Sequence, residues 1–134
     1  MLRAERRISR RDLADALGVV LLAVGIAGTL GILLGLVAGY AGGWVDNVLT
    51  LLMDIVFAFP AILLAIAIIS LLGNNLTNAM IAIAIVYMPT FMRIVRGATV
   101  SVRHTAYVES AVSLGASTPR VLAAHVFPNI TAPL

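Results

Sequence analysis

Ala16-Leu-Gly-Val-Val-Leu-Leu-Ala-Val-Gly-Ile-Ala-Gly-Thr-Leu-Gly-Ile-Leu-Leu-Gly-Leu-Val-Ala-Gly-Tyr40 contains no charged residue. About 20 apolar residues are enough to cross a bilayer as a helix, so this run predicts a membrane span. A second apolar stretch, Val48 to Met92, carries Asp54 as its one charge. The chain of 134 residues is 61% hydrophobic and 11% charged, whereas a soluble domain carries about 25% charge. The sequence therefore predicts an all-α, polytopic membrane protein.

Three spans are expected, separated by short polar turns. The first is followed by the turn 41–46, where Tyr40 and Trp44 suit the aromatic belt of a membrane interface. Pro60 is expected to bend the second span, and Pro89 to kink the third or end its regular part. The predicted spans are about 17–40, 48–72 and 79–98.

The first fifteen residues, 1–15, are polar and rich in arginine. They predict either an amphipathic helix on the membrane surface or the basic region of a signal peptide. The apolar run that follows is longer than the roughly 7–15 residues of a signal-peptide core, which favours a retained span. An odd number of spans places this segment and the arginines from Arg93 onward on opposite sides, although both favour the cytoplasm. Because of this conflict, and because the sequence stops at Leu134, we expect a partial chain.

The residue types that the sequence lacks exclude several kinds of site. There is no cysteine, which excludes disulfides, zinc–thiolate centres and thiol catalysis. The nine Lys-or-Arg positions are all arginine, and without lysine the chain cannot form a standard P-loop. The arginines lie at the ends of apolar runs, not on a basic face with interleaved aromatics, which argues against nucleic-acid binding. His104 and His125 have no accompanying ligand cluster, so we expect no metal and no cofactor.

Gly31, Gly35 and Gly39 form a ladder with one glycine every four residues. Glycines at this spacing line one face of a helix and let another helix approach closely. The alternative is the general enrichment of glycine in membrane helices, and the sequence favours neither. If the ladder does pack, we expect its partner to be a helix that this chain lacks.

Asp54 is the one carboxylate inside a predicted span, about 9 Å in from Val48 at 1.5 Å per residue. A charge at this depth is costly unless it is paired or hydrated. It predicts either a pathway or gating residue or, as we favour, a structural pair with Arg93 or Arg96. Asp54 alone does not supply a catalytic constellation, so an intramembrane enzyme is not expected.

The polar segment 105–128 predicts two short helices with a sharp bend between them. Residues 105–114 can form the first helix, and Gly115 can take the positive φ that ends it. Thr118 is a good N-cap for a second helix over Pro119 to His125, which Pro128 is expected to end.

This segment resembles the EAA signature of ABC importer permeases. That pattern has Glu-Ala-Ala, a glycine six residues after the glutamate and a proline thirteen residues after the glycine. Glu109, Gly115 and Pro128 have this spacing, Ala111 matches the second alanine, and Ser110 replaces the first.

Further motifs place the resemblance in the dipeptide, oligopeptide and nickel importer permeases, over residues 17–134. Phe127 replaces the usual leucine before the proline. The matching motifs are Gly39-Tyr-Ala-Gly-Gly-Trp-Val-Asp46, Asp54-Ile-Val-Phe-Ala-Phe-Pro60, Arg93-Ile-Val-Arg-Gly97 and His125-Val-Phe-Pro-Asn129.

The resemblance implies a type I importer permease in the cell inner membrane. Its expected partners are a second permease subunit, two ABC ATPase subunits that hydrolyse ATP, and a periplasmic or lipoprotein substrate-binding protein. In the family the EAA loop is cytoplasmic and docks on the ATPase. By this resemblance the coupling residues are Glu109, Ala111, Gly115, His125 and Pro128. The substrate stays open between peptides, nickel and other small solutes.

A different class of protein remains as the alternative. In that reading, the chain is a small membrane adaptor or anchor that binds a soluble partner through residues 100–134. What binds this segment separates the two hypotheses.

Overall fold

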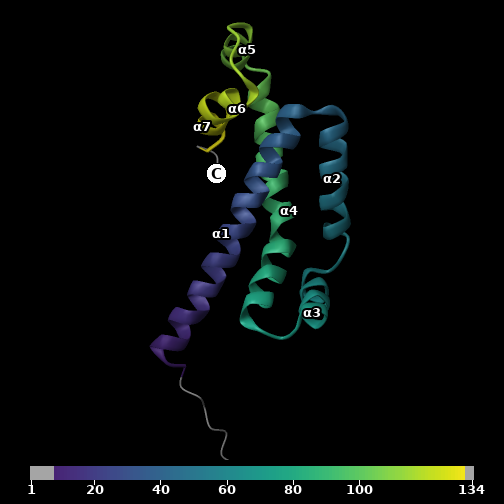
Figure 1. Cartoon of the computed structure of the whole chain (residues 1–134), viewed down its shortest axis with the longest axis vertical. Helices are drawn as coiled ribbons and strands as arrows, with labels where there is room; N and C mark the ends of the chain where they lie inside the picture. Colours follow the sequence, from purple (N-terminus) through teal and green to yellow (C-terminus); the bar gives the residue numbers. More distant parts are fainter. Residues whose placement is uncertain (1–7, 132–134) are drawn as a thin grey trace, which may run out of the picture.

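The computed structural model describes residues 8–131 and contains helices but no strands within that range. The predicted polar segment lies outside the described residues from Met1 to Arg7, as does the end of the chain from Ala132. Figure 1 shows α1, α2 and α4 as neighbouring rods, with α3 across one end and the C-terminal helices at the other. The helices are α1 Arg10–Ala41, α2 Gly43–Phe57, α3 Ala61–Leu72, α4 Leu76–Arg103, α5 Ala106–Ser113, α6 Thr118–Val121, the π-helix η1 Leu122–Val126 and α7 Phe127–Thr131. The predicted all-α class is confirmed.

Helix α1 begins before the predicted span. Ser9 and Asp12 form a capping box, in which the Ser9 hydroxyl accepts from the Arg11 amide at 3.0 Å and the Asp12 carboxylate accepts from the Ser9 amide at 3.0 Å. Residues 10–15 therefore continue into α1, and the expected separate surface helix is wrong for this part. The helix ends at Gly42, whose φ of +62° favours glycine.

The second predicted span is two helices. α2 and α3 meet at residues 58–60 and are bent by 91° (Figure 1), which confirms the bend predicted at Pro60, although the bend divides the predicted span 48–72 into two helices. Pro60 has no amide hydrogen, and its ring disfavours a helical conformation at Phe59. Pro60 consequently stands before the first turn of α3, where a missing donor costs least.

Helix α4 is longer than the third predicted span, 79–98, and continues through Pro89 to Arg103, so of the two alternatives given for Pro89 the end of the regular helix is wrong. Pro89 is buried, and prolines are tolerated in membrane helices whose neighbours support them. By length and composition, α1 and α4 can each cross a membrane, and the α2–α3 pair is a third candidate if it counts as one span.

The glycine ladder packs against α4 of the same chain. A Cβ on Gly31 would lie 2.8 Å from the Met88 carbonyl oxygen, and one on Gly35 would lie 2.7 Å from the Met92 carbonyl oxygen. A Cβ on Gly39 would meet the Thr99 side chain at 2.7 Å. Both helices therefore run in the same direction at backbone-to-backbone distance. The expectation that this face needs a helix from outside the chain is wrong.

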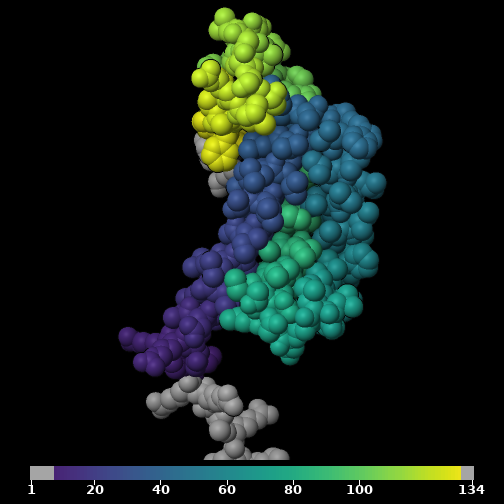
Figure 2. Space-filling view, in the orientation of Figure 1, coloured from purple at the N-terminus to yellow at the C-terminus, as the bar shows by residue number. Residues whose placement is uncertain are grey.

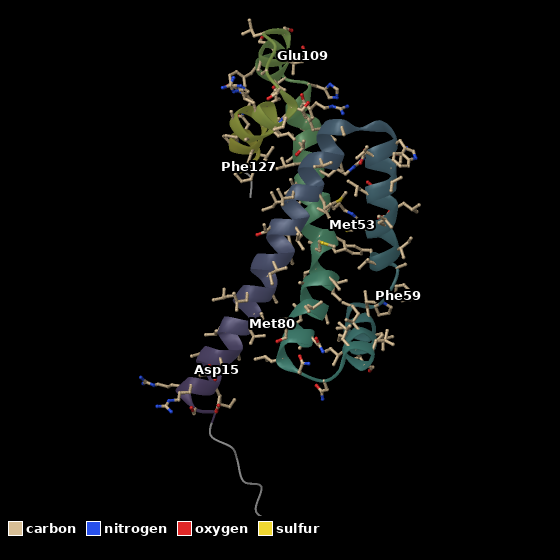
Figure 3. All side chains as sticks on the ribbon, in the orientation of Figure 1. Asp15, Met53, Phe59, Met80, Glu109 and Phe127 are labelled. Carbon is tan, nitrogen blue, oxygen red and sulfur yellow. The ribbon has the colours of Figure 1, made fainter. Side chains whose placement is uncertain are left out.

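The N-terminal end of α1 and the C-terminal helices lie at opposite ends of the molecule (Figures 1 and 2). Figure 3 shows this separation between Asp15 and Glu109. The two arginine-bearing ends are thus on opposite sides of the apolar helices, as the odd number of predicted spans requires.

Candidate functional site

The segment Ala106–Thr131, called the hairpin below, stands on the shared end of α1 and α4. It consists of α5, α6, η1 and α7. Four of its apolar side chains are fully or almost fully buried and join Leu36 of α1 and Val95 of α4 in one core. These four are Val108, Val121, Val126 and Ile130. The hairpin is therefore packed onto both long helices, so a force on it reaches them.

Gly115 makes the bend between the two halves of the hairpin. Its φ is +84°, the left-handed conformation predicted from the sequence. The Gly115 amide donates to the Val112 carbonyl at 3.0 Å, and the Ala116 amide donates to the Ala111 carbonyl at 3.2 Å. This pair of bonds is a Schellman motif and satisfies two carbonyls at the end of α5. A side chain at this position would strain the bend.

The second half of the hairpin differs from the prediction. α6 begins at Thr118 with Ser117 before it, one residue earlier than expected. The wide π-turn η1 then leads into α7, which contains Pro128. The expectation that Pro128 ends the helix is wrong, because η1 runs directly into α7 and Pro128 is the second residue of α7.

Glu109 and Ala111 lie on different sides of α5. Glu109 is exposed in the first turn, where a negative charge is favoured by the helix dipole, and makes no ion pair within residues 8–131. It borders a groove of about 530 Å³ with Tyr40 and Arg103. Ala111, half-buried, lines a second groove of about 450 Å³ between α5 and the following helices, together with Gly115. Both grooves are open at the surface of the hairpin.

His125 lies in η1 and holds the two halves of the hairpin together. Its Nδ1 is 3.0 Å from the Tyr107 hydroxyl, and the two rings meet edge to face with centroids 5.1 Å apart. Tyr107 could not be predicted as a partner from the sequence, because the bend at Gly115 brings together two residues that are 18 positions apart.

The Tyr107→Phe variant tests this contact. Removing the hydroxyl keeps the ring contact and loses one hydrogen bond, which is expected to cost the closed hairpin about 1 kcal/mol. Amide hydrogen exchange over residues 106–126 is the measurement, and it should become roughly fivefold faster. Exchange in α1 should not change; an unchanged rate in the hairpin would contradict the role assigned to this pair.

Two arginines of α4 bind the corner between α1 and α2. Arg96 pairs with both carboxylate oxygens of Asp46, which also accepts from the Thr50 hydroxyl at 3.1 Å. Arg103 donates to the Tyr40 carbonyl at 3.1 Å, near the end of α1. Asp46 was not predicted as a partner of Arg96, because the two residues are 50 positions apart and only the packing of α2 on α4 brings them together.

Asp54 pairs with Arg93, at 2.9 Å between Oδ1 and Nη2, and not with Arg96. Arg93 is one of the two partners that the sequence offered for Asp54, and whether the pair is structural or part of a pathway stays a prediction. Pro60 follows α2, at the elbow between α2 and α3. No cluster of three or more His, Asp or Glu side chains that could bind a metal lies within residues 8–131.

Comparison with known proteins agrees with this architecture. Residues 31–134 match the family described as the binding-protein-dependent transport system inner membrane component. The chain is 46% identical over 104 residues to the dipeptide transport system permease protein DppC of Alkalihalophilus pseudofirmus, covering 78% of this chain and 34% of that protein. It is 42% identical over 114 residues to the glutathione transport system permease protein GsiD of Pectobacterium atrosepticum, covering 85% of this chain and 37% of that protein.

The chain thus spans about a third of the length of these curated relatives. The family match covers the glycine ladder, the α2–α3 elbow, α4 and the hairpin. It is a family of transport-system membrane components, which agrees with the apolar helices. The chain therefore belongs to the binding-protein-dependent transport system inner membrane component family, which confirms the predicted resemblance to ABC importer permeases of the peptide-transport group.

Proposed function

We propose that this chain acts in the cell inner membrane as part of the multi-pass permease of an ABC importer for small peptides, and that the hairpin couples it to an ATPase. The peptide class rests on the relatives named for dipeptide and glutathione transport. The partners are two ABC ATPase subunits, which carry out ATP hydrolysis, a second permease subunit and a substrate-binding protein outside the membrane. The hairpin faces the cytoplasm.

The observation that carries the coupling role is the way the hairpin is built. Its inner side chains pack on Leu36 and Val95, whereas Glu109 and Leu114 point outward and are exposed. A partner that holds the outer side can therefore move α1 and α4 through the inner side. Protein interiors are close-packed, which allows a small shift at one end to be transmitted along packed helices.

The experiment compares Glu109→Ala and Gly115→Pro in the importer reconstituted with its ATPase. Gly115→Pro cannot adopt the φ of +84°, so it is expected to lose the bend and to lower peptide-stimulated ATP hydrolysis and uptake at least about tenfold. Glu109→Ala removes an exposed charge and is expected to weaken ATPase association several-fold in a salt-dependent manner.

Gly25→Ala is the matched control, because a Cβ at Gly25 meets nothing within 4 Å. It should leave uptake and hydrolysis unchanged. Normal uptake and substrate-stimulated hydrolysis in both hairpin variants would show that the hairpin is not the coupling element. Hairpin binding to a soluble protein other than an ABC ATPase would favour an adaptor instead.

A further inference from the structure

The ion pair between Asp54 and Arg93 is exposed at membrane depth. The two side chains keep 54% and 58% of their surface, and the Arg93 guanidinium also lies 4.5 Å from the Phe57 ring centre. Asp54 lies about 9 Å in from Val48, where the second predicted span begins, at 1.5 Å per residue. Exposed charges at this depth are costly against lipid, so this side of the molecule faces water or protein.

The same side carries further polar residues on both helices. On α4, Thr90 and Arg93 are exposed, as is Gly97, at spacings of three and four residues that place them on one helix face, and Ile94 is exposed beside them. On α2, Asn47 and Asp54 are exposed and Thr50 is half-buried, again at spacings of three and four, with Leu51 exposed beside them. The Asp54–Arg93 bond joins the two rows. We call these six residues the polar face.

The exposed side of α1 has the opposite character. Leu22, Leu30 and Leu33 keep 47–59% of their surface, and no charged residue lies between Ala16 and Tyr40. This composition suits lipid. Leu33 follows Gly31 and precedes Gly35, which contact α4 at Met92 and Val95 respectively, so it lies at the depth of Arg93. At one level, the molecule therefore presents a side that carries an ion pair and a side that carries no charge.

The polar face continues at the elbow between α2 and α3. A pocket of about 200 Å³ lies there and is lined in part by Phe57, Tyr87 and Thr90. Thr90 belongs to both the pocket and the polar face, so the largely apolar pocket adjoins the polar face.

We propose that the polar face is a wall of the water-filled route through the importer, and that Asp54 and Arg93 contact a passing solute that carries both an ammonium and a carboxylate group. The proposal rests on the transport function proposed above. Within residues 8–131 the pair is joined by one hydrogen bond, from Arg93 Nη2 to Asp54 Oδ1. Asp54 Oδ2 and the other guanidinium N–H groups stay available to water or to a zwitterionic peptide.

The chain has no cysteine, which allows single cysteines to report water access. Thr90→Cys and Gly97→Cys lie on the polar face, and a Cβ at Gly97 meets nothing within 4 Å. Leu33→Cys is the control at equal depth on the apolar side. Each is introduced into the assembled importer in membrane vesicles, with cysteines of the other subunits removed, and treated with a charged methanethiosulfonate reagent.

We expect Thr90→Cys and Gly97→Cys to react at least about tenfold faster than Leu33→Cys, because a charged reagent reaches thiols through water and not through lipid. A saturating dipeptide should slow both reactions. Polar-face cysteines that react no faster than Leu33→Cys would overturn the proposal, since the face would then be covered by protein. Fast reaction that dipeptide does not slow would contradict the contact with the solute but would support a water-filled wall.

The labelling does not depend on the hairpin. Fast, dipeptide-protected labelling with normal ATP coupling in Gly115→Pro would contradict the coupling role and leave the wall intact. Slow labelling together with lost coupling in Gly115→Pro would contradict the wall alone.

Discussion

Replacing Gly35 with alanine is expected to weaken the contact between α1 and α4 by about 1–3 kcal/mol. The added Cβ would lie 2.7 Å from the Met92 carbonyl oxygen, 2.8 Å from Val95 Cβ and 3.0 Å from the Arg96 amide nitrogen. Two of these atoms belong to the backbone and cannot rotate away. The helices must therefore separate, and the contacts of Gly31 and Gly39 along the same ladder loosen with them.

The measurement uses a single reporter cysteine in the cysteine-free chain. Thr99 is fully buried beside Gly39, so Thr99→Cys becomes reactive only when α1 and α4 part. In the detergent-solubilised importer, Gly35→Ala should raise its reaction rate with N-ethylmaleimide by roughly 5–150-fold, the factor that corresponds to 1–3 kcal/mol. Gly25→Ala on the same helix has open space and should leave the rate unchanged. Equal rates for Gly35→Ala and Gly25→Ala would refute the close-contact argument.

Much of this fold follows from hydrophobic patterning. Apolar runs of bilayer length require helices, because no other segment can satisfy its backbone hydrogen bonds alone in lipid. The glycine spacing correctly indicated a face for close packing. It did not identify the partner, since any helix with a suitable surface could have filled that role. Only the three-dimensional structure brings Met92 and Val95 to Gly31 and Gly35.

The two prolines inside apolar runs have different outcomes. Pro60 and Pro89 are both prolines inside apolar runs, yet one divides a helix and the other lies within one. The outcome depends on neighbours: Pro89 is buried against other parts of the chain, whereas Pro60 is exposed at an elbow. The sequence shows that proline lacks a hydrogen-bond donor, but it does not show the packing that compensates for the missing donor.

For the hairpin too, only part of the structure could be predicted from the sequence. Gly115 could be placed in the left-handed conformation from sequence, because glycine is the residue that adopts it at low cost. The π-turn before Pro128 and the contact of Tyr107 with His125 could not, since both depend on how the two halves fold together.

The second large effect is expected at Asp46. Both carboxylate oxygens accept from Arg96, and the two side chains keep only 14% and 34% of their surface. Asp46→Leu would leave the arginine partly buried without its partner, at a cost of about 2–3 kcal/mol to the α2–α4 contact. The exposed pair of Asp54 and Arg93 is the internal comparison, and Asp54→Asn should cost under about 1 kcal/mol.

A double-mutant cycle separates the interaction energy between Asp46 and Arg96 from the cost of leaving either charge buried without its partner. Asp46→Leu and Arg96→Met are made singly and together, and Met53→Cys, buried where α2 meets α4, reports opening by its reaction with N-ethylmaleimide. Figure 3 shows Met53 between these helices. Each single change should speed the reaction by roughly 30–150-fold, the factor for 2–3 kcal/mol. The double change should recover more than half of the lost free energy of the α2–α4 contact, because no unpaired charge remains buried.

If the two single effects simply add, Asp46 and Arg96 act independently, and the pair does not join the α1–α2 corner to α4. If they do not add, the Asp46–Arg96 pair joins the corner to the helix that carries the hairpin, and a displacement of the hairpin is expected to move α2 as well as α1.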